Sequence, residues 1–67
     1  MKNLIEYYND SAYIDTKELD QYAEEGNLTD DEVMLDLYAE LEGYSYIETE
    51  RGNGRSGGRR MIFHKTI

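Results

Sequence analysis

The sequence has no cysteine, no proline, no tryptophan and a single histidine, His64. Without cysteine the chain can form neither a disulfide nor a thiolate metal site, and one histidine leaves a zinc site almost entirely to carboxylates. Apolar runs stop at three residues, as in Val33-Met34-Leu35, which excludes a membrane-spanning helix and the apolar core of a signal peptide. We therefore expect a cytoplasmic protein without a metal, a cofactor or a membrane partner.

Motifs for catalysis are also missing. No serine or cysteine stands at a spacing from His64 that suggests a nucleophile and its base. The acidic run Asp30-Asp31-Glu32 lacks the ligand spacing and the glycine of a calcium loop. The glycines between residues 51 and 59 do not lead into a helix, as those of a phosphate-binding loop would. These absences predict a protein that is not an enzyme.

Charge is abundant but unevenly distributed. All fifteen acidic residues lie between Glu6 and Glu50, so residues 1–50 carry a net charge of −13, whereas residues 51–67 carry +5. The net charge of the chain is −8, and its 67 residues are too few for more than one domain. This division of charge indicates two surfaces with different partners, or one surface that folds back on the other.

Two predicted helix starts carry the same signature. Asp15 precedes Glu18 by three residues, and Thr29 precedes Glu32 by three. This is the spacing of a capping box, in which each side chain accepts a hydrogen bond from the backbone N–H of the other residue. The helices predicted from these starts span residues 15–25 and 29–42, and the glycines expected to be left-handed at their ends are Gly26 and Gly43.

The segment before the first of these helices predicts a further short helix. Leu4, Ile5 and Tyr8 have the spacing of an amphipathic helix over residues 1–9, and Ala12-Tyr13-Ile14 predicts one brief strand. Tyrosines with core spacing are expected to be buried and the others to be partly exposed. The first group is Tyr8, Tyr22 and Tyr38, and the second is Tyr7, Tyr13, Tyr44 and Tyr46.

The C-terminal third predicts a hairpin. Alternation of apolar and polar residues favours strands over residues 44–50 and 60–66, joined by a flexible, glycine-rich tip at residues 51–59. The side chains expected to face the core are Ile47, Met61 and Phe63. The side chains expected to pair across the hairpin are Glu48 and Glu50 with Arg59 and Arg60.

This order of elements resembles a winged helix-turn-helix domain. The segments that carry the resemblance are Thr16-Lys17-Glu18-Leu19 in the second helix, Gly26-Asn27-Leu28-Thr29 in the turn, Leu37–Gly43 before the wing and Tyr44-Ser45-Tyr46-Ile47 at its start. The resemblance implies a small α+β domain over residues 1–67, with three helices and a C-terminal β-hairpin whose tip is rich in glycine and arginine. In this family the third helix enters the major groove, yet its first turn here is Thr29-Asp30-Asp31-Glu32, which phosphates repel.

Acidic side chains on the two capped helices form the first candidate site. They are Asp20, Glu24, Glu25, Asp30, Asp31, Glu32, Asp36 and Glu40. Carboxylates on successive helix turns approximate the charge spacing of DNA, so this face is predicted to bind and inhibit a host protein with a basic, nucleic-acid-binding surface. In size, charge and tyrosine content the chain resembles small acidic inhibitors of phages and mobile elements, some of which mimic DNA. That resemblance implies the host cytoplasm as its location, and a merely solvated helix surface is the alternative.

Arginines at the hairpin tip form the second candidate site. Arg51, Arg55, Arg59 and Arg60 are suited to phosphate or nucleic acid because the guanidinium group is planar and permanently charged. The alternative function is thus a winged-helix transcriptional regulator that contacts DNA through its wing, as a dimer whose acids face away from DNA. The same arginines can instead pair with the chain's own acids, and exposed tyrosines suit a protein-binding adaptor. The sequence leaves these alternatives open, as it does the choice between monomer and homodimer.

Overall fold

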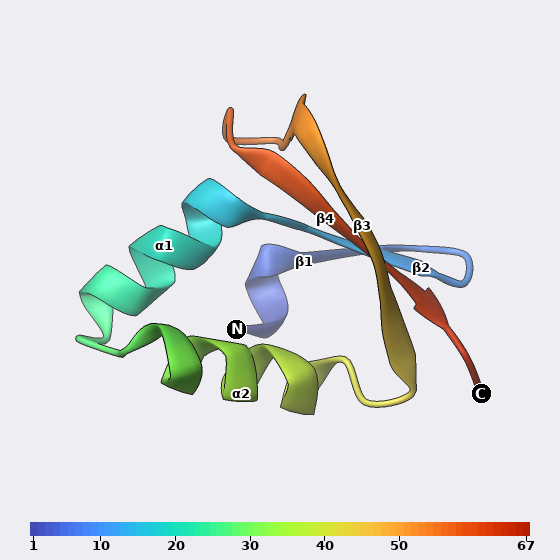
Figure 1. The fold of residues 1–67 in the computed structure, drawn as a ribbon, viewed down its shortest axis with the longest axis horizontal. Coiled ribbons are helices and arrows are strands. Elements are labelled where there is room, and N and C mark those ends of the chain that lie inside the picture. Colours follow the sequence, from blue (N-terminus) through green and yellow to red (C-terminus); the bar gives the residue numbers. More distant parts are fainter.

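The chain forms a strand hairpin, then two helices, then a second strand hairpin (Figure 1). This is a computed structural model, and it describes all of residues 1–67. The elements are a 3-10 turn at Lys2–Leu4, β1 at Ile5–Tyr8, β2 at Ser11–Asp15, α1 at Thr16–Glu25, α2 at Asp30–Glu40, β3 at Tyr44–Asn53 and β4 at Arg59–Lys65.

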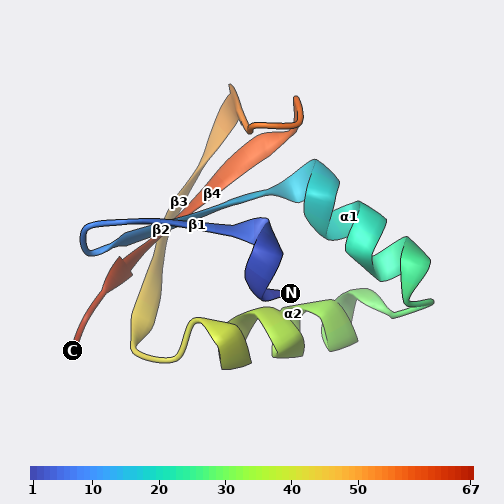
Figure 2. The same cartoon turned by 180° about the vertical axis from the view of Figure 1, so that it is seen from behind.

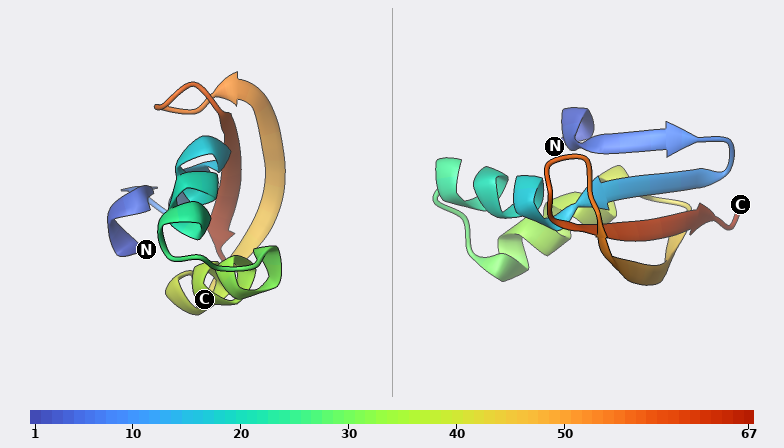
Figure 3. Two further views of the ribbon diagram at one scale, coloured as in Figure 1. Left: turned by 90° about the vertical axis from the view of Figure 1, so that its left-hand side faces the viewer. Right: turned by 90° about the horizontal axis from the view of Figure 1, so that it is seen from above.

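The four strands form one antiparallel sheet in the order β1-β2-β4-β3. The two hairpins, from opposite ends of the sequence, meet where β2 pairs with β4 in the middle of the sheet (Figure 2). Both helices lie on the same side of this sheet (Figure 3), and α1 contacts the two central strands. The molecule is therefore a two-layer α+β domain with a sheet layer and a helical layer.

The predicted architecture of three helices and a C-terminal hairpin is wrong. The segment assigned to a first helix is the strand β1, which pairs with β2 through a two-residue turn, Asn9-Asp10. Asn9 has a φ of 52°, a conformation that suits the turns of tight hairpins. Pairing places Ile5 opposite Ile14 in the core and leaves Tyr8 68% exposed. With a sheet strand in place of that helix, the chain does not have the winged-helix arrangement.

The core lies between the helical layer and one face of the sheet. Strand register brings Ile5, Ile14 and Met61 side by side across three strands, and it sets Ala12 opposite Phe63. Since alternate residues of a strand share a face, these side chains all point toward the helices. The buried apolar cluster comprises Ile5, Ala12, Ile14, Leu19, Val33, Leu37, Leu41 and Phe63.

Three apolar side chains expected in the core are exposed. Ile47 is 49% exposed because it lies at a register shift of β3, where Tyr46 and Glu48 pair with consecutive residues of β4. Tyr38 is 54% exposed and Tyr8 68% exposed. On α2 the buried stripe is Val33, Leu37 and Leu41 at four-residue spacing, which turns Tyr38 toward the outside. Tyr22 is half-buried, and Met61 packs at the margin of the core.

The helix and strand predictions C-terminal to residue 15 are confirmed in outline. Asp15 and Thr29 are the N-caps of α1 and α2. Gly43 is left-handed as expected, with a φ of 86°. After α1, however, the left-handed residue is Asn27 with a φ of 51°, while Gly26 keeps a helical φ of −89°. The predicted tip is shorter than expected, because β3 continues to Asn53 and β4 begins at Arg59.

Candidate functional site

The eight acidic residues predicted as a site all lie on the helical layer and are all exposed. We call them the acidic surface: Asp20, Glu24 and Glu25 on α1, with Asp30, Asp31, Glu32, Asp36 and Glu40 on α2. None of them is in an ion pair, since the two ion pairs of the chain use Glu18 and Glu50. The acidic surface therefore presents its full charge to the solvent.

The net charge of the chain is concentrated in the helical layer. Residues 16–40, which form the helical layer, contain Lys17 and Glu18, which offset each other, and the eight carboxylates of the acidic surface. The remaining acids of the chain equal its remaining lysines and arginines in number, so the helical layer carries the whole net charge of −8. A surface of this kind attracts a cationic partner from a distance and repels nucleic acid.

A recess of about 370 Å³ opens on the acidic surface, lined by Met1, Tyr22, Asp36, Ala39 and Glu40. The hydroxyl of Tyr22 on α1 donates a hydrogen bond to Asp36 Oδ2 on α2 at 3.0 Å. This bond, followed by burial and by the negative charge of Asp36 and Glu40, raises the pKa of Tyr22. Two carboxylates one helical turn apart, beside an aromatic ring, are suited to an arginine or lysine side chain.

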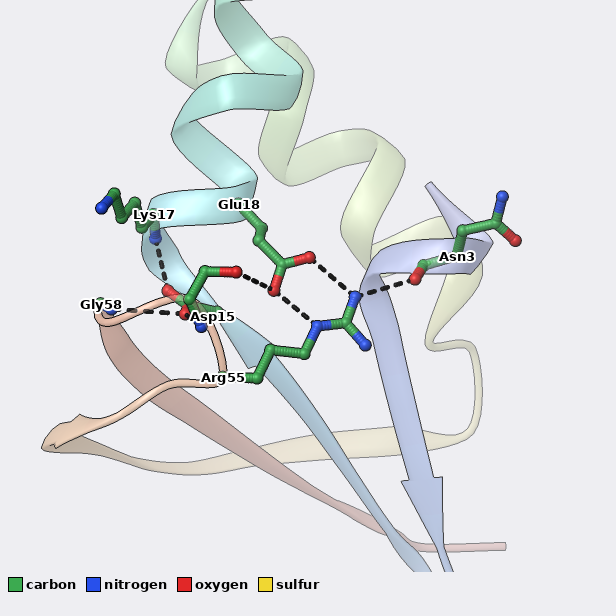
Figure 4. Close-up of polar contacts among 7 residues, drawn as sticks. Asn3, Asp15, Lys17, Glu18, Arg55 and Gly58 are labelled. Carbon is green, nitrogen blue, oxygen red and sulfur yellow. Dashed lines mark hydrogen bonds and ion pairs between the residues drawn. The ribbon is translucent and has the colours of Figure 1, made fainter.

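Two of the four candidate arginines form ion pairs with glutamates of the same chain, and Arg55 is the first. Its Nε and one terminal nitrogen donate to the two oxygens of Glu18 at 2.6 and 2.7 Å, and the same terminal nitrogen donates to the carbonyl of Asn3 at 3.0 Å (Figure 4). The hydrogen bonds from Arg55 are the largest cause that lowers the pKa of Glu18. Arg55 therefore ties the β3–β4 loop to α1 and to the N-terminal turn.

Arg60 is the second arginine that forms an ion pair with a glutamate of the same chain. It donates to Glu50 Oε1 at 2.8 Å, which confirms one of the predicted pairs across the hairpin, and its guanidinium lies 4.6 Å from the ring centre of Tyr13. The hydrogen bond from Arg60 lowers the pKa of Glu50. Arg51 and Arg59 are exposed and form no ion pair. Of the predicted basic site, only these two arginines keep a free guanidinium group.

Sequence reasoning missed the role of Asp15 beyond its helix cap. Its side chain is only 3% exposed and accepts hydrogen bonds from the backbone N–H groups of Lys17 at 2.7 Å, Ser56 at 2.6 Å and Gly58 at 3.3 Å (Figure 4). Burial raises the pKa of Asp15, but the three backbone hydrogen bonds and the positive charge of Lys17 together outweigh it, so the pKa is lowered. The only sequence signal was the run of glycines around Ser56, which permits so close an approach of backbone to carboxylate.

Comparison of the chain with known protein families, with characterised proteins and with solved structures finds no match. Neither helix is long and apolar enough to cross a membrane. No group of three or more His, Cys, Asp or Glu side chains is placed to hold a metal ion. The acidic surface and the free arginines of the hairpin thus remain the two candidate binding sites.

Proposed function

We propose that this protein binds, through its acidic surface, a protein whose basic surface handles nucleic acid, and that it blocks that surface. The observation that carries the proposal is the net charge of −8 on residues 16–40, with no carboxylate of the acidic surface in an ion pair. Exposed charges of one sign on neighbouring helices produce a field that speeds encounter with an oppositely charged partner. Nucleic acid also presents negative charge to such a partner, so the two would compete for the same basic surface.

The recess beside Asp36 and Glu40 supports the proposal with a specific contact. A basic nucleic-acid-binding surface displays arginines and lysines, and the recess offers one of them two carboxylates beside the side chain of Tyr22. Contacts of this kind at the centre of an interface contribute more to affinity than charges at its rim. We therefore expect Asp36 and Glu40 to matter more to binding than the acids of the first turn of α2.

The test is capture from a host-cell lysate on the immobilised chain, with duplex DNA as competitor. We expect retained nucleic-acid-binding proteins that duplex DNA displaces. Raising the salt from about 0.1 M to about 1 M should release them, because the Debye length shortens from about 10 Å to about 3 Å. Retention that neither DNA nor salt reverses contradicts the proposal.

A matched pair of variants separates the acidic surface from charge in general. Asp31→Lys, Asp36→Lys and Glu40→Lys together should abolish capture. The control combines Glu6→Lys, Asp10→Lys and Glu48→Lys, which change the net charge equally at exposed positions outside the helices. The control should retain the partner. Equal loss of capture in both variants means that net charge, and not the acidic surface, is responsible, and circular dichroism confirms that each variant is folded.

The fold does not favour the alternative function of a winged-helix regulator. Its recognition depended on a first helix that is the strand β1, and Arg55 and Arg60 of its basic wing are bound to Glu18 and Glu50.

A further inference from the structure

The two arginines without an internal partner lie together at the loop end of the C-terminal hairpin. Pairing of β3 with β4 sets Glu50 opposite Arg60 and Thr49 opposite Met61. Alternation along the strands then places the ion pair of Glu50 and Arg60 on one face of the hairpin and Thr49, Arg51 and Arg59 on the other. The second face has two guanidinium groups and no carboxylate bound to either.

These three residues line a recess of about 210 Å³, and no other residue contributes to it. The volume is several times the roughly 30 Å³ that one water molecule occupies in the liquid, so it admits a polyatomic anion. An irregularity in the ladder shapes the recess. Between Glu50 and Asn53 the residues Arg51 and Gly52 have no partner on β4, and Gly52 has a φ of 73°. This bulge positions Arg51 beside Arg59.

Two guanidinium groups that line the same recess repel each other unless an anion lies between them. The other two arginines of the hairpin show how this chain uses guanidinium groups structurally, since Arg55 and Arg60 each donate to a glutamate. Arg51 and Arg59 lack such a partner although the chain has fifteen acids. A cationic pair left free in so acidic a molecule is explained by a ligand that supplies the missing negative charge.

We propose that Thr49, Arg51 and Arg59 form a binding site for the phosphate group of a small molecule. Guanidinium groups donate paired hydrogen bonds that match the oxygens of a phosphate. The hydroxyl of Thr49 lies 2.6 Å from that of Tyr46, and when Tyr46 donates this hydrogen bond Thr49 keeps its own proton to donate to the ligand. A small ligand suits the site better than a nucleic acid strand, because a polyanion would also meet the net charge of −8. This site is independent of the acidic surface and of the function proposed for it.

The experiment is a titration of the isotope-labelled protein followed by NMR of the arginine Nε–H groups and of the Thr49 amide. Inorganic phosphate, a nucleoside monophosphate and a short DNA duplex are added separately at constant ionic strength. We expect saturable shifts at Thr49, Arg51 and Arg59 with the first two ligands. Saturation by the nucleotide at lower concentration than by phosphate identifies a nucleotide ligand, and the reverse order identifies free phosphate.

Variants decide whether the shifts report a site. Arg59→Gln, and separately Arg51→Gln, should weaken phosphate binding by about tenfold, the loss expected when a hydrogen bond to a charged group is removed. Lys65→Gln removes the same charge from the exposed end of β4 and should change binding by no more than about twofold, since distant charges are screened. Shifts that never saturate, equal weakening by Lys65→Gln, or tighter binding of the duplex than of both small ligands would overturn the proposal.

Discussion

The starts of α1 and α2 carry the same sequence signature but differ in the hydrogen bonds that their side chains form. At α2 the capping box is complete and local: the N–H of Glu32 donates to Thr29 Oγ1 at 3.2 Å, and the N–H of Thr29 donates to Glu32 Oε1 at 2.9 Å. At α1 the box does not form. Asp15 caps the helix by accepting from the N–H of Lys17 and not from that of Glu18, and the Glu18 side chain binds Arg55.

The difference follows from burial. Thr29 and Glu32 are exposed, so their only partners are each other and water. Asp15 is buried under the β3–β4 loop, where it accepts two more N–H groups from Ser56 and Gly58. An identical local pattern therefore caps a helix in one place and joins a helix to a distant loop in the other. The start of α1 should consequently matter to the stability of the whole domain, and the start of α2 to one helix end.

The largest expected effect comes from Asp15→Ala. The substitution removes the helix cap and leaves the N–H groups of Ser56 and Gly58 without an acceptor, so we expect a loss of about 2–4 kcal/mol in the free energy of unfolding. Urea denaturation followed by circular dichroism at pH 7 measures it. The matched change at the other helix, Thr29→Ala, should cost about 1 kcal/mol. Equal losses at the two positions would remove the distinction between the helix starts.

Gly58→Ala should have the next largest effect. A Cβ at Gly58 would lie on the carboxylate of Asp15 and 2.7 Å from the backbone nitrogen of Lys17, so the loop must move away from α1. We expect a loss of about 1–3 kcal/mol, the usual range for overpacking. Gly57→Asn is the control, because a Cβ there meets nothing within 4 Å and asparagine tolerates its φ of 89°. A smaller loss at Gly58 than at Gly57 would contradict the close contact with Asp15.

Acid should weaken the contacts at the start of α1. The pKa values of Asp15 and Glu18 are lowered in the folded protein, so the unfolded chain takes up their protons first. Their contribution to stability is therefore complete above about pH 5 and is lost as the pH falls through the lowered pKa values. Urea midpoints measured from neutral to acidic pH should fall more steeply for the wild type than for Asp15→Asn. Parallel curves would show that Asp15 is not a source of the acid sensitivity.

The smallest effect distinguishes the two glutamates of the signature. Glu18→Gln removes the charge that binds Arg55, whose side chain is 39% exposed, and should cost about 1 kcal/mol or less. Glu32→Gln keeps an acceptor for the N–H of Thr29 and should change stability by only about 0.3 kcal/mol. Thermal denaturation of both variants measures the difference, and a larger loss for Glu32→Gln would reverse our assignment.

For the N-terminal segment, residues 1–9, the sequence pattern could not distinguish a helix from a strand. Leu4, Ile5 and Tyr8 fit a helical face, yet in so short a segment the same residues also fit a strand. The segment forms a strand because pairing with β2 buries Ile5 beside Ile14. The helices were predictable because their caps are local, and the C-terminal hairpin was predictable because its strands alternate. No local signal specified that β2 and β4 would be neighbours.

The candidate sites divide in the same way. Exposure of the eight acids could be predicted, because charged residues on the outer face of an amphipathic helix stay in water. Which arginines are free could not, because Arg55 and Glu18 are 37 residues apart in sequence. The hydrogen bonds that join Asp15 to the β3–β4 loop could not be predicted either, since one of their donors is the N–H of Ser56, 41 residues away.

By itself the sequence determined the start of each helix, the alternation of the C-terminal strands and the concentration of net charge in residues 16–40. These properties depend on residues within a few positions of each other. Only the tertiary structure decided the strand order, the burial of Asp15 and the division of the arginines into two that bind glutamates and two that remain free. Each of these requires segments from distant parts of the chain to meet, and packing of the two hairpins in one sheet is what brings them together.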